Sequence, residues 1–118
     1  MKNRQVRAKL IPNLEKTFEE LKSELKNLCK ACGLQDLTAL EYHSLSVVET
    51  NVIRRGKAYK RIQLKAYYTK NGKLRSKTLK SFKPEEAPRQ LQKIVLLYRG
   101  LRHFSKALDY LLWLLRNF

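Results

Sequence analysis

The middle of this 118-residue chain changes from helical to strand periodicity, and this change limits the possible folds more than any other feature. From Ala58 to Thr69 apolar and polar side chains alternate, as they do in a strand with one buried face. Asn71-Gly72 follows, and this dipeptide between alternating segments is the strongest short hairpin signal. With the Val-, Ile- and Thr-rich residues 46–55, the turn at 55–57 and residues 74–82, the pattern predicts a three-stranded antiparallel meander.

Helical spacing flanks the meander on both sides. In residues 12–32 the apolar side chains recur at steps of three and four, which gives one stripe, and Gly33 suits the position just past a helix end. Helical spacing returns in residues 84–118, where Pro88 separates a short first turn from the main helix. We therefore predict an α+β fold of order α-β-β-β-α, with the three-stranded antiparallel sheet packed against N- and C-terminal helices.

Length and composition predict a single α+β domain of residues 11–118 behind a basic arm of residues 1–10. Apolar residues make up 43% of the sequence, enough for a modest core. The arm has no apolar segment typical of a secretory leader, and no run of about eighteen apolar residues predicts a membrane span. We expect a flexible arm that orders on nucleic acid or is an inert terminus. We expect the protein to be cytoplasmic, either nucleoid-associated or in a nucleoprotein complex.

The charge of the meander is one-sided. Residues 50–84 contain twelve Lys or Arg and no Asp or Glu, in a chain whose formal net charge is +16. Charges of one sign repel one another, and most protein surfaces intersperse both signs. The pattern indicates a polyanionic partner, for which nucleic acid is the simplest candidate.

The turn at Asn71-Gly72 decides whether the cations of the second and third strands share a face. A two-residue loop would pair Tyr68 with Arg75 and place cations on the apolar face. A three-residue loop with Gly72 in a left-handed bulge would pair Tyr67 with Arg75 instead. Because burial of an unpaired cation costs several kcal/mol, we predict the three-residue loop and a single basic face. The faces of the first strand stay open.

The predicted nucleic-acid-binding residues are cationic, aromatic or amide side chains of this meander. They are Arg54, Arg55, Lys57, Tyr59, Arg61, Gln63, Lys65, Tyr67, Lys70, Lys73, Arg75 and Lys77. The cations would neutralise phosphates, and Gln63 is suited to reading a base edge. Tyr59 and Tyr67 are suited either to stacking on unpaired bases or to forming cross-strand pairs within the sheet.

Residues 67–79 (YYTKNGKLRSKTL), followed by the helix start Pro-Glu-Glu-Ala at 84–87, resemble the arm-type DNA-binding domain of tyrosine recombinases. The resemblance implies a three-stranded sheet that inserts into the major groove of duplex DNA. Small proteins of bacterial and archaeal mobile elements are similar in this hairpin and in Ser-Val-Val-Glu at 46–49. The resemblance covers about residues 44–90 and departs at Ala58-Tyr59, where arm domains usually have Gly and Trp. It implies a stand-alone accessory protein or regulator linked to a mobile element, since no recombinase catalytic domain fits in the remaining residues.

Few side chains indicate catalysis, so we expect a protein that is not an enzyme and has no cofactor or metal. No paired carboxylates lie on the predicted strands, where metal-dependent phosphate chemistry would need them. Cys29 and Cys32 form a single C-x-x-C, whereas a structural zinc site needs four ligands and only His43 and His103 remain. We predict that the two cysteines pack in the core, with zinc binding and redox activity as alternatives.

Residues 107–118 predict an association surface, because the helix becomes apolar on all sides and must be buried. The interface residues are Leu108, Leu111, Leu112, Trp113, Leu115 and Phe118. The N-terminal helix, a second copy or a larger partner protein would cover them, and we favour a partner. Two alternatives to DNA binding stay open: an RNA-binding component of a ribonucleoprotein, and a basic adaptor or inhibitor that docks on an acidic protein surface.

Overall fold

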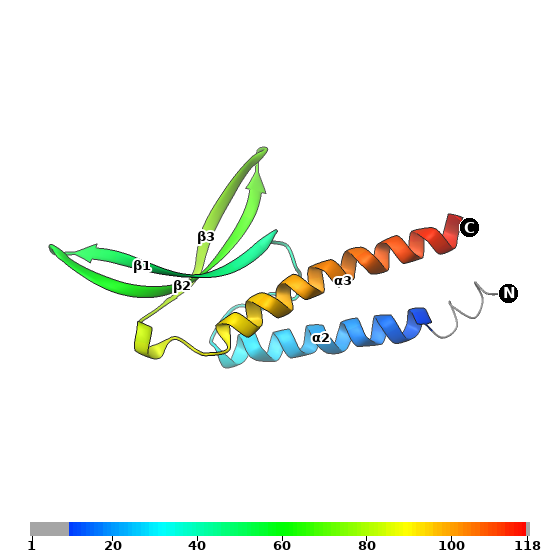
Figure 1. Ribbon diagram of the computed structural model, residues 1–118, viewed down its shortest axis with the longest axis horizontal. Helices are drawn as coiled ribbons and strands as arrows, with labels where there is room; N and C mark the ends of the chain where they lie inside the picture. The colour runs from blue at the N-terminus through cyan, green and yellow to red at the C-terminus, as the bar shows by residue number, and fades with distance from the viewer. Residues whose placement is uncertain (1–9, 118) are drawn as a thin grey trace.

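The computed structural model describes residues 10–117 and confirms the α+β fold (Figure 1). Its elements are α2 (Ile11–Ala31), β1 (Ser44–Arg54), β2 (Lys57–Lys70), β3 (Lys73–Phe82), the short 3-10 helix η2 (Pro84–Glu86) and α3 (Leu91–Asn117). As predicted, Pro88 lies between η2 and the long final helix. Residues 1–9 of the predicted basic arm and Phe118 of the predicted interface lie outside the described residues.

The two long helices run side by side in opposite directions, and the sheet lies against one end of the pair (Figure 1). Their contact uses the apolar stripe predicted on α2: Phe18 stacks on Phe104 of α3, with ring centroids 5.5 Å apart. An ion pair of 3.3 Å between Lys93 and Glu24 also joins the helices. The β1–β2 hairpin and the helix ends lie at opposite ends of an elongated molecule, 70 × 33 × 16 Å in extent (Figure 1).

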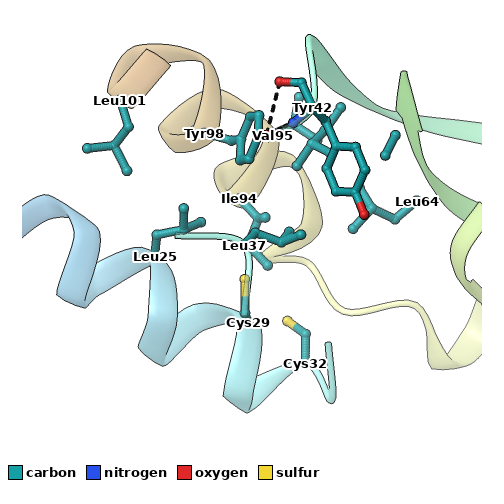
Figure 2. Close-up of a cluster of buried hydrophobic side chains, with 12 residues drawn as sticks. Leu25, Cys29, Cys32, Leu37, Tyr42, Leu64, Ile94, Val95, Tyr98 and Leu101 are labelled. Atoms are coloured by element: carbon teal, nitrogen blue, oxygen red, sulfur yellow. Dashed lines mark hydrogen bonds between the residues drawn. The ribbon is translucent and has the colours of Figure 1, made fainter. Parts of the chain in front are cut away.

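The core lies where α3 crosses one face of the sheet (Figure 2). Leu64 and Ala66 of β2 are fully buried there together with Ile94 of α3. These strand residues belong to the face predicted to be apolar, which confirms the alternation of β2. Complete burial of a large side chain such as Leu64 or Ile94 stabilises the folded state by roughly 1.5–3 kcal/mol. The face of the sheet that meets α3 is called the packed face below, and the opposite one the outer face.

A buried tyrosine ties the loop before β1 to α3. The Tyr98 hydroxyl donates a hydrogen bond to the Tyr42 carbonyl (3.0 Å) and accepts one from the Tyr42 amide (2.8 Å; Figure 2). Arg102, one turn further along α3, donates to the Leu40 carbonyl at 2.9 Å and also to that of Tyr42. The backbone entering β1 therefore has its buried polar groups paired.

Cys29 and Cys32 pack in the core at the end of α2, which confirms the core-packing prediction (Figure 2). Burial raises the pKa of both thiols, and it is the main cause in each case. Because the thiolate is the reactive form, this environment disfavours nucleophilic chemistry at either sulfur.

Both hairpin turns have two residues, so the prediction of a three-residue loop is wrong. Arg55 and Gly56 form the first turn, Asn71 and Gly72 the second, and all four have φ between +52° and +76°. Two successive left-handed residues define the type I′ turn, whose twist matches that of the flanking strands. The second turn pairs Lys70 with Lys73 across the hairpin.

The penalty expected for a two-residue loop does not arise, because the β2–β3 hairpin projects beyond the helices (Figure 1). Lys73, Arg75 and Lys77 lie on the packed face by register, yet all three are exposed. The apolar part of that face ends at Tyr68, opposite Arg75. These cations are therefore solvated rather than buried.

A β-bulge restores the apolar register near the end of β3. Lys65 pairs with Thr78 and Leu64 with Lys80, so Leu79 is the extra residue. The bulge lets both Leu79 and Phe82 reach the core, although they are three positions apart and an uninterrupted strand would direct them to opposite faces.

The register of β1, which the sequence left open, follows from its pairing with β2. Val47 lies opposite Leu64 on the packed face, and Val48 lies opposite Gln63 on the outer face. Strand β1 therefore contributes apolar side chains to both faces.

Candidate nucleic-acid interface

The strongest candidate site is a groove on the outer face, where β2 continues beyond the end of β3. Phe82 of β3 pairs with Ile62, so the preceding β2 residues 57–61 pair with β1 alone. The short helix η2 contacts β2, and its residues Pro84 and Glu85 border the groove. The groove has a volume of about 1140 Å³. It is lined by Val52, Arg54, Arg55, Tyr59, Lys60, Arg61, Gln63, Ser81, Lys83, Pro84 and Glu85. This set, called the outer groove below, contains five cations and one carboxylate.

Arg61 is held in the outer groove by the end of β3. Its Nε donates to the Ser81 hydroxyl at 3.0 Å, and one terminal nitrogen donates to the Ser81 carbonyl at 3.2 Å. A guanidinium has five N–H donors, so donors remain for a ligand. The side chain is half-buried and pre-oriented, which reduces the entropy lost when it binds an anion.

The outer groove also contains an exposed aromatic ring and an amide. Tyr59 is 50% exposed and lies opposite Val52 of β1. Gln63 is half-buried between Val48 and Ser81 on the two neighbouring strands. A solvent-exposed ring next to cations is suited to stacking on a base, and an amide is suited to donating to and accepting from a base edge.

Two predicted residues of the outer face lie further along β2, outside the lining of the groove. Lys65 and Tyr67 are both half-buried. The Tyr67 hydroxyl lies 2.9 Å from the Ser46 hydroxyl of β1, a hydrogen bond that fixes the ring along the sheet. Tyr67 thus has the cross-strand role that was one of its two predicted alternatives.

The predicted single basic face does not form. Register places Lys70, Lys73, Arg75 and Lys77 on the packed-face side of the β2–β3 hairpin, whereas Arg61 and Lys65 are on the outer face. The physical reason is the two-residue turn, because a change of one residue in register moves every side chain of a strand to the other face. These four residues are called the hairpin cations below.

One of the hairpin cations already has a protein partner. The Lys77 ammonium lies 5.1 Å from the centre of the Tyr42 ring, within the range of a cation–π contact. The Tyr42 hydroxyl raises the pKa of this ammonium. Lys77 therefore supports the β1 entry as well as adding charge to the hairpin.

The turn of the first hairpin contributes the remaining predicted cations. Arg54 and Lys57 face each other across the Arg55-Gly56 turn, and all three basic side chains are exposed. Arg54 and Arg55 line the outer groove, whereas Lys57 lies at its end, outside the lining. Opposed cations destabilise an isolated sheet, so an anionic ligand at this tip would stabilise it.

Six lining residues of the outer groove were not predicted from the sequence: Val52, Lys60, Ser81, Lys83, Pro84 and Glu85. Alternation places Lys60 on the packed-face side of the sheet, and its ammonium pairs there with Glu49 at 3.6 Å, although the residue also borders the groove. Lys83 carried no local signal in the sequence, because its place at the groove depends on the path of the chain after β3.

The predicted C-terminal interface is only partly exposed. Leu108 is buried, and Leu112 and Leu115 line, with Ile11 of α2, a small hollow of about 230 Å³. These leucines lie on the α2 side of α3, which is one of the predicted alternatives, and Leu111 is half-buried; the partner surface stays a prediction. Trp113, in contrast, is 54% exposed.

Two further kinds of site, a metal-ligand cluster and a membrane-spanning helix, are absent from residues 10–117. In this part of the chain no group of three or more His, Cys, Asp or Glu side chains is placed to hold a metal ion. Over the same residues, no helix combines the length and hydropathy required to cross a membrane.

Comparison with known proteins gives no significant match to a family model, a curated protein or a solved structure. The likeness of residues 44–90 to recombinase arm domains therefore stays a prediction, and the functional argument depends on the geometry of the site.

Proposed function

We propose that this protein binds nucleic acid without catalysing a reaction on it, and that the outer groove is the contact surface. One observation carries the proposal: Arg54, Arg55, Arg61 and Lys83 line the groove together with Tyr59 and Gln63, and among the described residues Glu85 is the one carboxylate in the lining. Cations gathered in this way repel one another, and a row of phosphates would remove that repulsion. Release of the counterions condensed on the nucleic acid would supply most of the affinity.

The first candidate ligand is duplex DNA. The β1–β2 hairpin is a two-stranded ribbon that projects from the body of the molecule (Figure 1), and the major groove admits a ribbon of this kind. Arg54, Arg55 and Lys57 at its tip would lie near phosphates or guanine edges. A role as an accessory protein or regulator of a mobile element is the function that the recombinase-like hairpin favours.

The exposed Tyr59 ring supports a second candidate, single-stranded RNA in a ribonucleoprotein. Base stacking on aromatic side chains is typical of single-strand recognition, and the ring lies among the groove cations. The duplex and the single strand make different demands on Tyr59, so a substitution there separates them.

Titration of labelled duplex DNA and single-stranded RNA over a range of salt concentrations tests the proposal. The protein must first be freed of nucleic acid. If the four groove cations other than Lys60 contact duplex phosphates, the slope of log affinity against log salt should be about −3.6. Absence of binding to either ligand at low salt, or a slope shallower than about −2, would contradict the proposal and favour a basic adaptor for an acidic protein.

A further inference from the structure

The last turns of α3 expose a stacked aromatic pair that the proposed function does not use. Tyr110 and Trp113 are 61% and 54% exposed. Their ring centroids are 6.1 Å apart, and the ring planes differ by 15°. Asn117 donates a hydrogen bond to the Trp113 carbonyl at 2.8 Å, within the last turn of the helix. Large rings of this kind at a surface are typical anchors of protein interfaces.

Helix geometry explains why α2 leaves this pair uncovered. Leu108 and Leu112 turn towards α2. Tyr110 follows Leu108 by two residues, or about 200° around the helix, and Trp113 follows Leu112 by about 100°. The aromatic pair therefore lies on a side of α3 that is turned away from α2.

We propose that the Tyr110–Trp113 pair binds the same pair of a second copy of this chain. The charge distribution favours this occupant. Residues 107–117 contain one acid, Asp109, and one base, Arg116, so this segment is neutral in a chain of net charge +16. An acidic partner protein would be attracted to the cationic hairpins instead of to this neutral segment.

The shape of the molecule supports the same occupant. The end of α3 and the β1–β2 hairpin lie at opposite ends of the 70 Å long axis (Figure 1). Two copies that meet through the ends of α3 keep their β1–β2 hairpins much further apart than the screening length of about 10 Å at 0.1 M salt, so repulsion between these hairpins is weak in this arrangement. A contact of one patch with itself also closes into a two-fold dimer.

Salt should strengthen this self-association. Two chains of net charge +16 repel each other. Screening reduces that repulsion, whereas it weakens binding to nucleic acid. Higher salt should therefore strengthen self-association and weaken binding to nucleic acid.

Sedimentation equilibrium of nucleic-acid-free protein at about 0.1 M and about 1 M salt tests the inference. We expect the weight-average mass to rise with protein concentration from 14.0 kDa towards twice that value, and to rise further at high salt. Trp113 is the only tryptophan, so its emission should shift to the blue over the same concentration range. The double variant Tyr110→Ser/Trp113→Ser should associate at least about tenfold more weakly.

Leu96→Ser is the matched control, because Leu96 is also 54% exposed on α3 but lies away from the pair. It should leave the dissociation constant unchanged, and circular dichroism should show that all variants are folded. A chain that stays monomeric at both salt concentrations would overturn the inference, even if another protein captures it. Unchanged association of the double variant would overturn it as well. Neither result affects the nucleic-acid titration, because the aromatic pair lies outside the outer groove.

Discussion

The β1–β2 and β2–β3 hairpins share strand β2 and have the same kind of turn, but they present their cations in different settings. In the first hairpin, Arg54, Arg55 and Arg61 line a groove that is closed on one side by residues 81–85. In the second, the hairpin cations lie on a ribbon that projects from the molecule (Figure 1).

This difference shows that cations close together in the sequence need not lie close together in the folded structure. Alternation fixes the face of a residue within a strand, and the turn and any bulge fix it between strands. A concave cationic surface focuses its field on a ligand more strongly than a solvated ribbon does. We therefore expect the outer groove to supply most of the affinity, and the hairpin cations to add a weaker contribution.

The largest predicted effect is a loss of stability on substitution in β2, the strand that both hairpins share. Leu64 is fully buried and lies between Val47 of β1 and Lys80 of β3. Leu64→Ala should lower the free energy of unfolding by about 2–5 kcal/mol, because it leaves a cavity beneath both hairpins. Urea denaturation measures this loss. Leu74→Ala, at a position 70% exposed on β3, should change stability by less than about 0.5 kcal/mol. Similar losses for both variants would show that the hairpins do not share this core.

A smaller loss is expected where α3 holds the entry of β1. Tyr98→Phe removes the hydroxyl that pairs with both backbone groups of Tyr42. The buried Tyr42 amide would lose its acceptor, so the free energy of unfolding should fall by about 1–3 kcal/mol. Tyr110→Phe, at an exposed position, is the control and should have little effect. Equal melting temperatures for the two variants would argue against this anchor.

Within the outer face, Tyr59 and Tyr67 should differ in their effect on binding. Tyr59 is exposed in the groove, whereas Tyr67 is fixed by Ser46. We expect Tyr59→Ala to weaken binding of single strands by about 1–3 kcal/mol, and binding of duplex DNA by less. Tyr67→Ala should have the smaller effect on either ligand. Fluorescence anisotropy titrations measure both, and a larger loss for Tyr67→Ala would move the contact surface away from the groove.

The smallest predicted effect is a change in stability on substitution at the first position of each hairpin turn. Arg55 and Asn71 both have left-handed φ, at +52° and +54°. Asn tolerates this conformation better than Arg, so Arg55→Asn should stabilise the protein by several tenths of a kcal/mol. Asn71→Arg should destabilise it by a similar amount. Thermal denaturation checks the signs, and stabilisation by both substitutions would contradict the turn assignment.

The element order could be predicted because each element carries its own periodic pattern. The stripe of residues 12–32, the alternation of 58–69 and the Asn71-Gly72 turn all act locally. The length of the loop at Asn71-Gly72 could not be predicted, because the energetic cost of each register depends on how far the helices cover the sheet. That extent is a tertiary property. The spacing of Leu79 and Phe82 was the one local sign of a bulge.

The candidate site was only partly predictable for the same reason. The cations of the β1–β2 hairpin follow from composition, and Arg61, Gln63 and Tyr59 share a face through alternation. The contribution of Lys83 depends on the path of the chain after β3, which no local pattern specifies.

The most direct test compares matched charge removals in the two hairpins. Arg54→Gln/Lys83→Gln removes two exposed cations of the outer groove, and Lys73→Gln/Arg75→Gln removes two exposed hairpin cations. The affinity for duplex DNA is measured against salt concentration for both variants and the unmodified chain. The account predicts that the groove variant loses affinity and that its log–log salt slope becomes shallower by about 1.8, with a much smaller change for the hairpin variant. An equal or larger change for the hairpin variant would contradict the assignment of the outer groove as the nucleic-acid interface.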